Sequence, residues 1–248
     1  MSRIGRLAHR VLPVAVDEWL RRQRPREGPP PLGDVRFGDF RRLVPMSRAF
    51  GFDRGQPVDR HYIEAFLASH AADVRGRVME VGDDGYTRRF GGDRVTQRDV
   101  LHVDASNANA TIVADLARGD GIPTNAFDCI VLTQTLHLIY DVPAAVRTLH
   151  RILRPGGVCL ITVPGISQID VGAWRDSWCW AFTPYSLRRA LADRFPDDTT
   201  VVRSYGNVLA ASAFLYGLAA EELSPSELDA ADPAYPVTVA ARATKSGD

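Results

Sequence analysis

Four short apolar segments constrain the fold of this chain most strongly. They are rich in β-branched residues, are bounded by turn residues, and cover residues 77–82, 100–104, 111–116 and 127–133. Runs of this kind are typical of strands buried on both faces of a parallel sheet. Three of them carry a carboxylate at or near their end: Glu80, Asp104 and Asp115. Because ligands of open parallel sheets bind beyond the carboxyl ends of the strands, the pattern predicts a site for a donor-rich ligand with ribose hydroxyls, an adenine amino group or a cationic centre.

Strands alternate with helices along the rest of the chain. Helical periodicity predicts helices over 61–74, 142–153, 184–195 and 208–223, and Thr183-Pro184 forms an N-cap and first-turn pair for the third of these. Further strands are expected at 158–163, 199–205 and 236–244, with the last two pairing antiparallel. This order predicts an α/β fold: a doubly wound, mostly parallel, seven-stranded sheet.

The first 57 residues have a different character. Residues 1–24 are basic and amphipathic, 25–33 are rich in proline, and 34–57 show no clear period. We therefore predict a basic, Pro-rich N-terminal extension or lid over 1–57, and a main domain over 58–248. A basic amphipathic segment can make peripheral contact with a membrane or grip a partner, or it can pack on the domain, and the sequence leaves these alternatives open.

Composition narrows the choice of partners. The 248 residues contain 30 basic and 30 acidic side chains, so net charge gives no indication of nucleic-acid binding. Three cysteines without metal-ligand spacing favour a reducing, cytoplasmic location, and no metal site is expected. No apolar run reaches the length of a membrane span. The sequence leaves the oligomeric state open.

Residues 127–157 resemble a known family. The segment has a strand that opens with Phe127-Asp128, a Leu136-His137 turn, Asp141, a helix, and an Arg-Pro-Gly-Gly turn at 154–157. It is similar, without a gap, to the class I S-adenosylmethionine-dependent methyltransferases, with arginine in place of the usual lysine. The resemblance covers about residues 58–245 and implies a Rossmann-like methyltransferase fold with S-adenosyl-L-methionine as the cofactor.

The resemblance also implies cofactor-binding positions. The first-strand loop approaches the methionine part, an acid after the second strand holds the ribose hydroxyls, and a following pair recognises adenine. A residue at the end of the fourth strand lies beside the transferred methyl group, and relatives often contact the methionine carboxylate from the helix before the first strand. In this order the positions are Glu80 and Gly82, Asp104, Asp115 and Leu116, Thr133, and Tyr62.

The first loop departs from the family pattern. The family has Glu-x-Gly-x-Gly-x-Gly, whereas this chain has Asp84 and Tyr86 at the second and third glycine positions. Glycines there permit positive φ and close approach to a ligand. A non-catalytic relative that binds a partner is therefore the alternative to an enzyme. A nicotinamide-dependent oxidoreductase is disfavoured, because the Gly-x-Gly-x-x-Gly turn is missing.

His137 is the candidate catalytic base, since histidine titrates near neutrality and lies just past the fourth strand. The alternative is that it packs or caps at this turn. Tyr140, Asp141 and His61 are weaker candidates. Tryptophans at 174, 178 and 180 can stack on an acceptor or anchor their loop. The turn Thr133-Gln-Thr-Leu lacks the Asn/Asp-Pro-Pro-Tyr signature of base- or amide-methylating relatives, so we predict a small-molecule acceptor and O-methylation of a sugar or secondary metabolite, a biosynthetic role.

Overall fold

The structure is a computed structural model, and it describes residues 28–247. Contacts divide the chain into two compact units, one ending at Leu43 and the other beginning at Val44. The first unit contains a short 3-10 turn over Gly38–Phe40. The amphipathic segment predicted at 1–24 lies outside the described residues. Residues 44–57, which the sequence assigned to the extension, belong to the second unit together with everything that follows.

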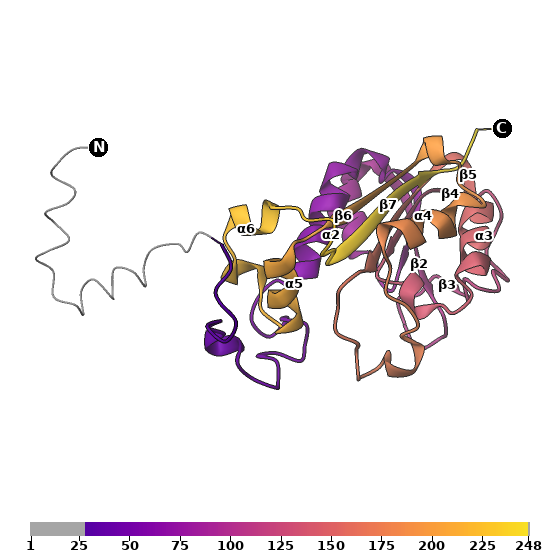
Figure 1. Cartoon of the computed structure of the whole chain (residues 1–248). Helices are drawn as coiled ribbons and strands as arrows, with labels where there is room; N and C mark the ends of the chain where they lie inside the picture. Colours follow the sequence, from indigo (N-terminus) through magenta and orange to yellow (C-terminus); the bar gives the residue numbers. More distant parts are fainter. Residues whose placement is uncertain (1–27, 248) are drawn as a thin grey trace, which may run out of the picture. The chain divides into compact units, whose positions relative to one another are not determined.

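Seven strands form one sheet in the order β3-β2-β1-β4-β5-β7-β6. β7 runs antiparallel to β5 and β6, and the other neighbours are parallel. The predicted doubly wound, mostly parallel sheet is confirmed, including the antiparallel last pair (Figure 1). The strands are β1 (Gly76–Val81), β2 (Val95–His102), β3 (Ile112–Val113), β4 (Phe127–Thr133), β5 (Leu153–Pro164), β6 (Thr200–Tyr205) and β7 (Thr238–Thr244).

Helices cover both faces of the sheet. Apolar residues of α3 (Val142–Ile152) and α4 (Pro184–Ala192) share one buried cluster with β1, β4, β5 and β7. α2 (Val58–Ser69) packs in a second cluster against the opposite side chains of the same strands. A third cluster joins α2 to α5 (Val208–Leu215) and α6 (Pro225–Asp229). Alternate residues of each central strand therefore pack in different layers, as a doubly wound fold requires.

Local sequence signals explain where the helices begin. The Asp141 carboxylate accepts the Ala144 N–H at 3.0 Å and caps α3. The predicted Thr183 cap is confirmed, because its hydroxyl accepts the Ser186 N–H at 3.0 Å in a capping box. Side-chain oxygens at these positions satisfy N–H groups that have no partner within the helix.

The helix predicted over 208–223 is shorter than expected. α5 ends at Leu215, and Gly217 follows with φ of +71°. A Cβ at Gly217 would lie 2.3 Å from the Ser47 carbonyl oxygen, so the chain turns here against residues 44–57. A second short helix over Ala220–Glu222 follows. This stop depends on a long-range contact, which apolar periodicity does not report.

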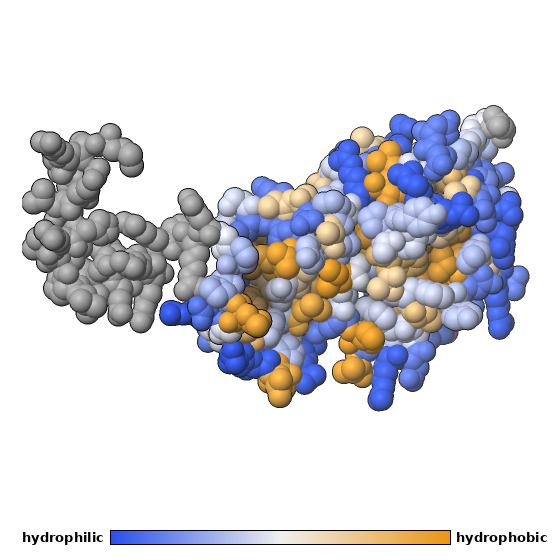
Figure 2. Space-filling view, viewed as in Figure 1, coloured by the Kyte–Doolittle hydropathy of each residue, from blue (hydrophilic) through white to orange (hydrophobic). Residues whose placement is uncertain are grey.

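The face of the molecule drawn in Figure 2 is mostly polar, with separate apolar patches. Within residues 28–247, no helix is both long and apolar enough to cross a membrane.

Candidate active site

A cavity of about 850 Å³ opens beyond the carboxyl ends of the parallel strands. Residues at or just after the ends of all five parallel strands line it. These residues are Val81 and Gly82, His102 and Val103, Ala114 and Asp115, Thr133 and Gln134, and Pro164. The edge predicted from the carboxylate-bearing strand ends is thus where the cavity lies. Its volume falls within the range of about 300–1,000 Å³ that is usual for small-molecule sites.

Glu80 lies at the wall of this cavity beside the first loop. Its side chain is only 2% exposed, and its carboxylate accepts the backbone N–H groups of Tyr86 at 3.2 Å and Thr87 at 2.7 Å. Burial raises the pKa of Glu80 to about 7, against the lowering effect of these hydrogen bonds. The Glu80 carboxylate therefore holds the backbone at the start of the helical turn over Thr87–Gly91. This structural role is separate from any contact with a ligand.

The glycine-poor loop leaves the cavity open. Gly82 has φ of +90°, and a Cβ built there would meet nothing within 4 Å, so the backbone faces free space. Asp84 turns away and pairs with Arg88 at 2.7 Å and Arg98 at 3.3 Å. Asp83 lines the cavity, but its carboxylate accepts the Gly85 N–H at 2.7 Å. Tyr86, at the third glycine position, lines the cavity, which still has a volume of about 850 Å³. The residues at the glycine positions therefore do not fill it.

The other acidic strand ends differ in their position. Asp115 and the buried Leu116 line the cavity, and Asp115 accepts the Ala117 N–H at 2.8 Å. Asp104 is not among the lining residues. Its carboxylate is 62% exposed and accepts the Ser106 N–H at 2.9 Å, while His102 takes the place in the wall.

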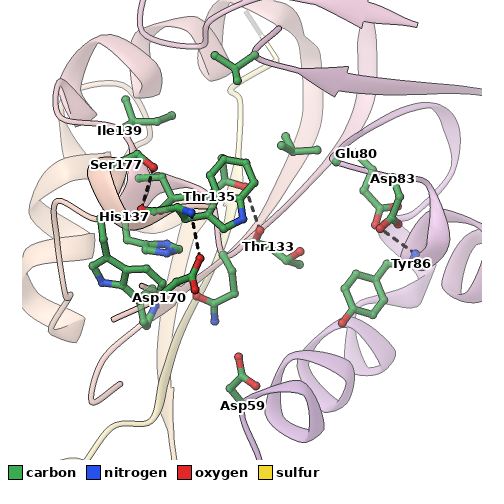
Figure 3. A pocket seen from close by; sticks show the side chains of 18 of the residues that line it. Asp59, Glu80, Asp83, Tyr86, Thr133, Thr135, His137, Ile139, Asp170 and Ser177 are labelled. Carbon is green, nitrogen blue, oxygen red and sulfur yellow. Dashed lines mark hydrogen bonds between the residues drawn. The ribbon is translucent and has the colours of Figure 1, made fainter. Parts of the chain in front are cut away.

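The end of β4 provides Thr133 and, four residues later in the turn, His137 (Figure 3). Between them Gln134 has φ of +44°, a left-handed conformation rare outside glycine. His137 is 2% exposed, and its Nδ1 has no hydrogen-bond partner among the described residues. Burial, and secondarily the charge of Arg60, lowers the pKa of His137 to about 4, so its imidazole is neutral at physiological pH.

The tryptophans at 174, 178 and 180 have different roles: two line the cavity, and one anchors the loop. Trp174 and Trp178 line the cavity, and the Trp178 ring packs edge-on against His137 with centroids 4.4 Å apart. Trp180 instead donates its indole N–H to the Ile139 carbonyl at 3.1 Å and stacks on the exposed Tyr140. The loop is therefore partly an anchor and partly a wall of the site.

The remaining candidates lie outside the cavity. The Tyr62 hydroxyl donates to the Leu228 carbonyl at 3.0 Å, and burial raises the pKa of Tyr62 to about 12. Asp141 is occupied as the α3 cap. Neither of these two residues, nor His61 or Tyr140, lines the cavity.

One wall of the cavity consists of residues that the sequence did not indicate. Phe50 and Phe52 come from the segment assigned to the extension, and Asp59 and Arg60 from the first turn of α2. Phe50 has φ of +57° and stacks on Trp178 with ring centroids 6.3 Å apart. A bulky side chain in the left-handed region is uncommon and often marks a functional site. In the sequence, this wall is indicated only by the high frequency of phenylalanine in residues 34–57, a segment with neither helix nor strand periodicity.

Comparison with protein families decides the identity of this fold. Residues 51–195, more than half of the chain, match a family model described as a methyltransferase domain. The chain belongs to this family. No curated protein matches it in sequence. The family match and the fold together confirm a class I S-adenosylmethionine-dependent methyltransferase, an enzyme whose cofactor is S-adenosylmethionine.

Solved structures share the fold at low sequence identity. The [4+2]-cyclase SpnF is 16% identical over 79% of this chain and 84% of its own, with a TM-score of 0.52. An S-adenosylmethionine-dependent methyltransferase from Archaeoglobus fulgidus is 12% identical over 75% and 94%, with a TM-score of 0.51. The N-methyltransferase NodS from Bradyrhizobium japonicum, in complex with S-adenosylhomocysteine, is 14% identical over 77% and 89%, with a TM-score of 0.50. At these identities the likeness concerns the fold alone.

The residues present fit the cofactor of the family. The cavity is large enough for a small molecule, the backbone at Gly82 is open to it, and Asp115 presents a carboxylate that is 41% exposed. A nucleoside with an amino group and a cationic sulfur needs these features: close backbone approach, acceptor oxygens and nearby negative charge.

Proposed function

We propose that this methyltransferase methylates a small-molecule acceptor, by O-methylation of a sugar or secondary metabolite. The observation that carries this proposal is the continuity of the cavity. Figure 3 shows Glu80 on one side of the open space and His137 on the other. Asp115 and Trp178 line the same cavity. Cofactor and acceptor thus have room side by side in one partly enclosed space, and aromatic walls suit the faces of a sugar or an aromatic ring.

Six positions at or near the strand ends would hold S-adenosylmethionine. Glu80 and Gly82 would border its methionine part, Asp115 and Leu116 its adenine, and Thr133 its methyl end. Asp104 is proposed for the ribose, since it lies two residues after the end of β2 and next to the lining residue Val103. When bound, the cofactor supplies a methyl group on a sulfonium; the acceptor oxygen bonds to this carbon, the carbon–sulfur bond breaks, and S-adenosylhomocysteine leaves.

His137 is the proposed proton acceptor. Its neutral ring has a buried nitrogen, Nδ1, without a partner in the described residues, and His137 lines the cavity next to Trp178. A hydroxyl acceptor needs a group that takes its proton as the new bond forms. Trp178, packed against His137, would shield the reacting atoms from part of the solvent, and the main contribution of the protein would be alignment of the acceptor.

The balanced charge and the three free cysteines support a cytoplasmic enzyme that does not act on nucleic acid. Contact of residues 1–24 with a membrane or partner stays a proposal.

A screen with isotope-labelled S-adenosylmethionine tests the acceptor class. Sugars, phenols and other hydroxylated small molecules should accept label on oxygen, and the products should show an O-methyl group by mass spectrometry. Transfer only to protein or nucleic acid, or only to nitrogen, would overturn the proposal.

A further inference from the structure

Arg60 is a cation in the cavity wall. It lies in the first turn of α2 and is half-buried. Among the residues that the structure describes, no carboxylate forms an ion pair with it, and its contact is the Phe52 ring, 5.8 Å from the guanidinium carbon. An aromatic ring can orient a guanidinium, yet it does not neutralise the charge.

Neighbouring arginines behave differently. Arg89 also lines the cavity, but it pairs with Glu64 at 2.8 Å. Arg88 and Arg98 both pair with Asp84. Arg60 therefore stands out as the arginine of this wall whose hydrogen-bonding groups remain available to a ligand.

The adjacent Asp59 forms no ion pair with Arg60 within residues 28–247. Its side chain is 8% exposed, and its Oδ1 has no hydrogen-bond partner in residues 28–247. Burial raises the pKa of Asp59, although the Arg60 charge opposes the rise. Asp59 is therefore a second polar group facing the same cavity, next to the Arg60 guanidinium.

The charge of Arg60 also reaches the acceptor side. After burial, it is the second cause of the lowered pKa of His137. Figure 3 shows His137 and Asp59 around the same open space. A ligand that offers a hydroxyl to His137 can therefore extend toward the Asp59–Arg60 end of the cavity, where a planar guanidinium matches a carboxylate or a phosphate.

We infer that the acceptor carries an anionic group, a carboxylate or phosphate, in addition to the hydroxyl that is methylated, and that Arg60 binds this group. The inference rests on the proposed function, which places the acceptor beside His137. Uronic acids and sugar phosphates have this combination of groups. The competing occupant is the cofactor's own carboxylate, because Arg60 also lies within electrostatic reach of Tyr86 in the first loop: burial raises the pKa of Tyr86, and the Arg60 charge opposes that rise.

Direct binding tests the inference without any reaction. The full-length protein is saturated with S-adenosylhomocysteine and titrated with inorganic phosphate or, separately, acetate, while tryptophan fluorescence is followed, because Trp178 contacts His137 in this cavity. Charge-assisted hydrogen bonds of this kind correspond to about a 10- to 100-fold change in affinity. Arg60→Gln should weaken binding of the preferred anion by that factor, and Arg60→Lys by less. The exposed Arg147 is the matched control, and Arg147→Gln should bind as the wild type does.

The same variants separate the competing explanations. S-adenosylhomocysteine affinity of Arg60→Gln should stay within about twofold of wild type. A loss of tenfold or more would assign Arg60 to the cofactor and overturn the inference, as would anion binding that is identical in Arg60→Gln and wild type. A phosphate response alone indicates a phosphorylated acceptor, and an acetate response alone a carboxylate.

Turnover assays add the link to function. Glucose, glucuronate and glucose 1-phosphate form a matched set that differs in the anion. Preference for a charged member that disappears in Arg60→Gln supports the inference, and equal use of all three contradicts it. Arg60-dependent anion binding without transfer to any hydroxylated compound would contradict the proposed O-methylation and leave the anion site standing.

Discussion

Replacing Glu80 with glutamine should change the free energy of unfolding by an amount that depends on pH. The carboxylate is buried and accepts two backbone N–H groups of the first loop, those of Tyr86 and Thr87. Glutamine has nearly the same shape but no charge, and its amide offers one acceptor oxygen instead of two. The substitution therefore removes an unfavourable buried charge and a favourable hydrogen bond at once.

The two effects have different pH dependence. Burial raises the pKa of Glu80 from 4.5 to about 7. Between these values the folded state holds a proton that the unfolded state has released, so the wild type loses stability as pH rises, by about 3 kcal/mol in total. The lost hydrogen bond leaves one buried N–H unpaired and costs about 1–3 kcal/mol at every pH.

Urea denaturation at pH 5, 7 and 9 measures the difference in free energy of unfolding between Glu80→Gln and the wild type. Glu80→Gln should be less stable than wild type at pH 5, and as stable or more stable at pH 9. Asp170 is the matched control: its carboxylate accepts two backbone N–H groups, from Gly172 and Trp174, but these bonds lower its pKa. The free energy of unfolding of Asp170→Asn should therefore differ from that of the wild type by the same amount at all three pH values. If the free energy of unfolding of Glu80→Gln also differed from wild type by the same amount at every pH, the claim that the Glu80 carboxylate is desolvated would be refuted.

Three further substitutions test the site and the fold. His137→Ala should lower turnover by about 10²–10⁴-fold while S-adenosylhomocysteine affinity is kept; unchanged turnover would make the residue structural. Because the pKa of His137 is lowered to about 4, the acid limb of the wild-type kcat profile should lie well below pH 6, and a limb near 6.5 would count against His137 as the titrating group. Gly82→Ala places a Cβ into open cavity space and should weaken S-adenosylhomocysteine binding tenfold or more in calorimetry, a result that equal affinities would contradict. Gly217→Ala instead meets the Ser47 carbonyl at 2.3 Å, so it should lose more unfolding free energy than Gly82→Ala, by about 1–3 kcal/mol; equal losses would count against this close contact.

The sheet could be predicted from the sequence because each strand is indicated by residues that are adjacent in the chain. Each buried strand is a short apolar run, and Asp141 and Thr183 lie at helix starts where side-chain caps are favoured. The end of the helix after Val208 could not be predicted in this way, since it depends on the approach of Gly217 to Ser47, 170 positions away.

The cavity could likewise be predicted only in part. Glu80, Gly82, Asp115, Leu116, Thr133 and His137 line it, as expected from strand ends. The wall formed by Phe50, Asp59 and Arg60 was not predicted. Phe50 comes from a segment without periodicity, and Asp59 and Arg60 come from the start of a helix whose apolar spacing indicates only packing against the core. The backbone conformation of Gln134 was also unexpected, since its positive φ has no signature in the residue type.

A crystal structure of the complex with S-adenosylhomocysteine tests the central claim most directly. The account predicts the nucleoside beyond the strand ends, with its adenine at Asp115 and Leu116, its amino-acid part at Gly82 and its sulfur directed toward His137. Electron density for the ligand elsewhere, or a cavity filled by the side chains of Asp83 and Tyr86, would contradict it.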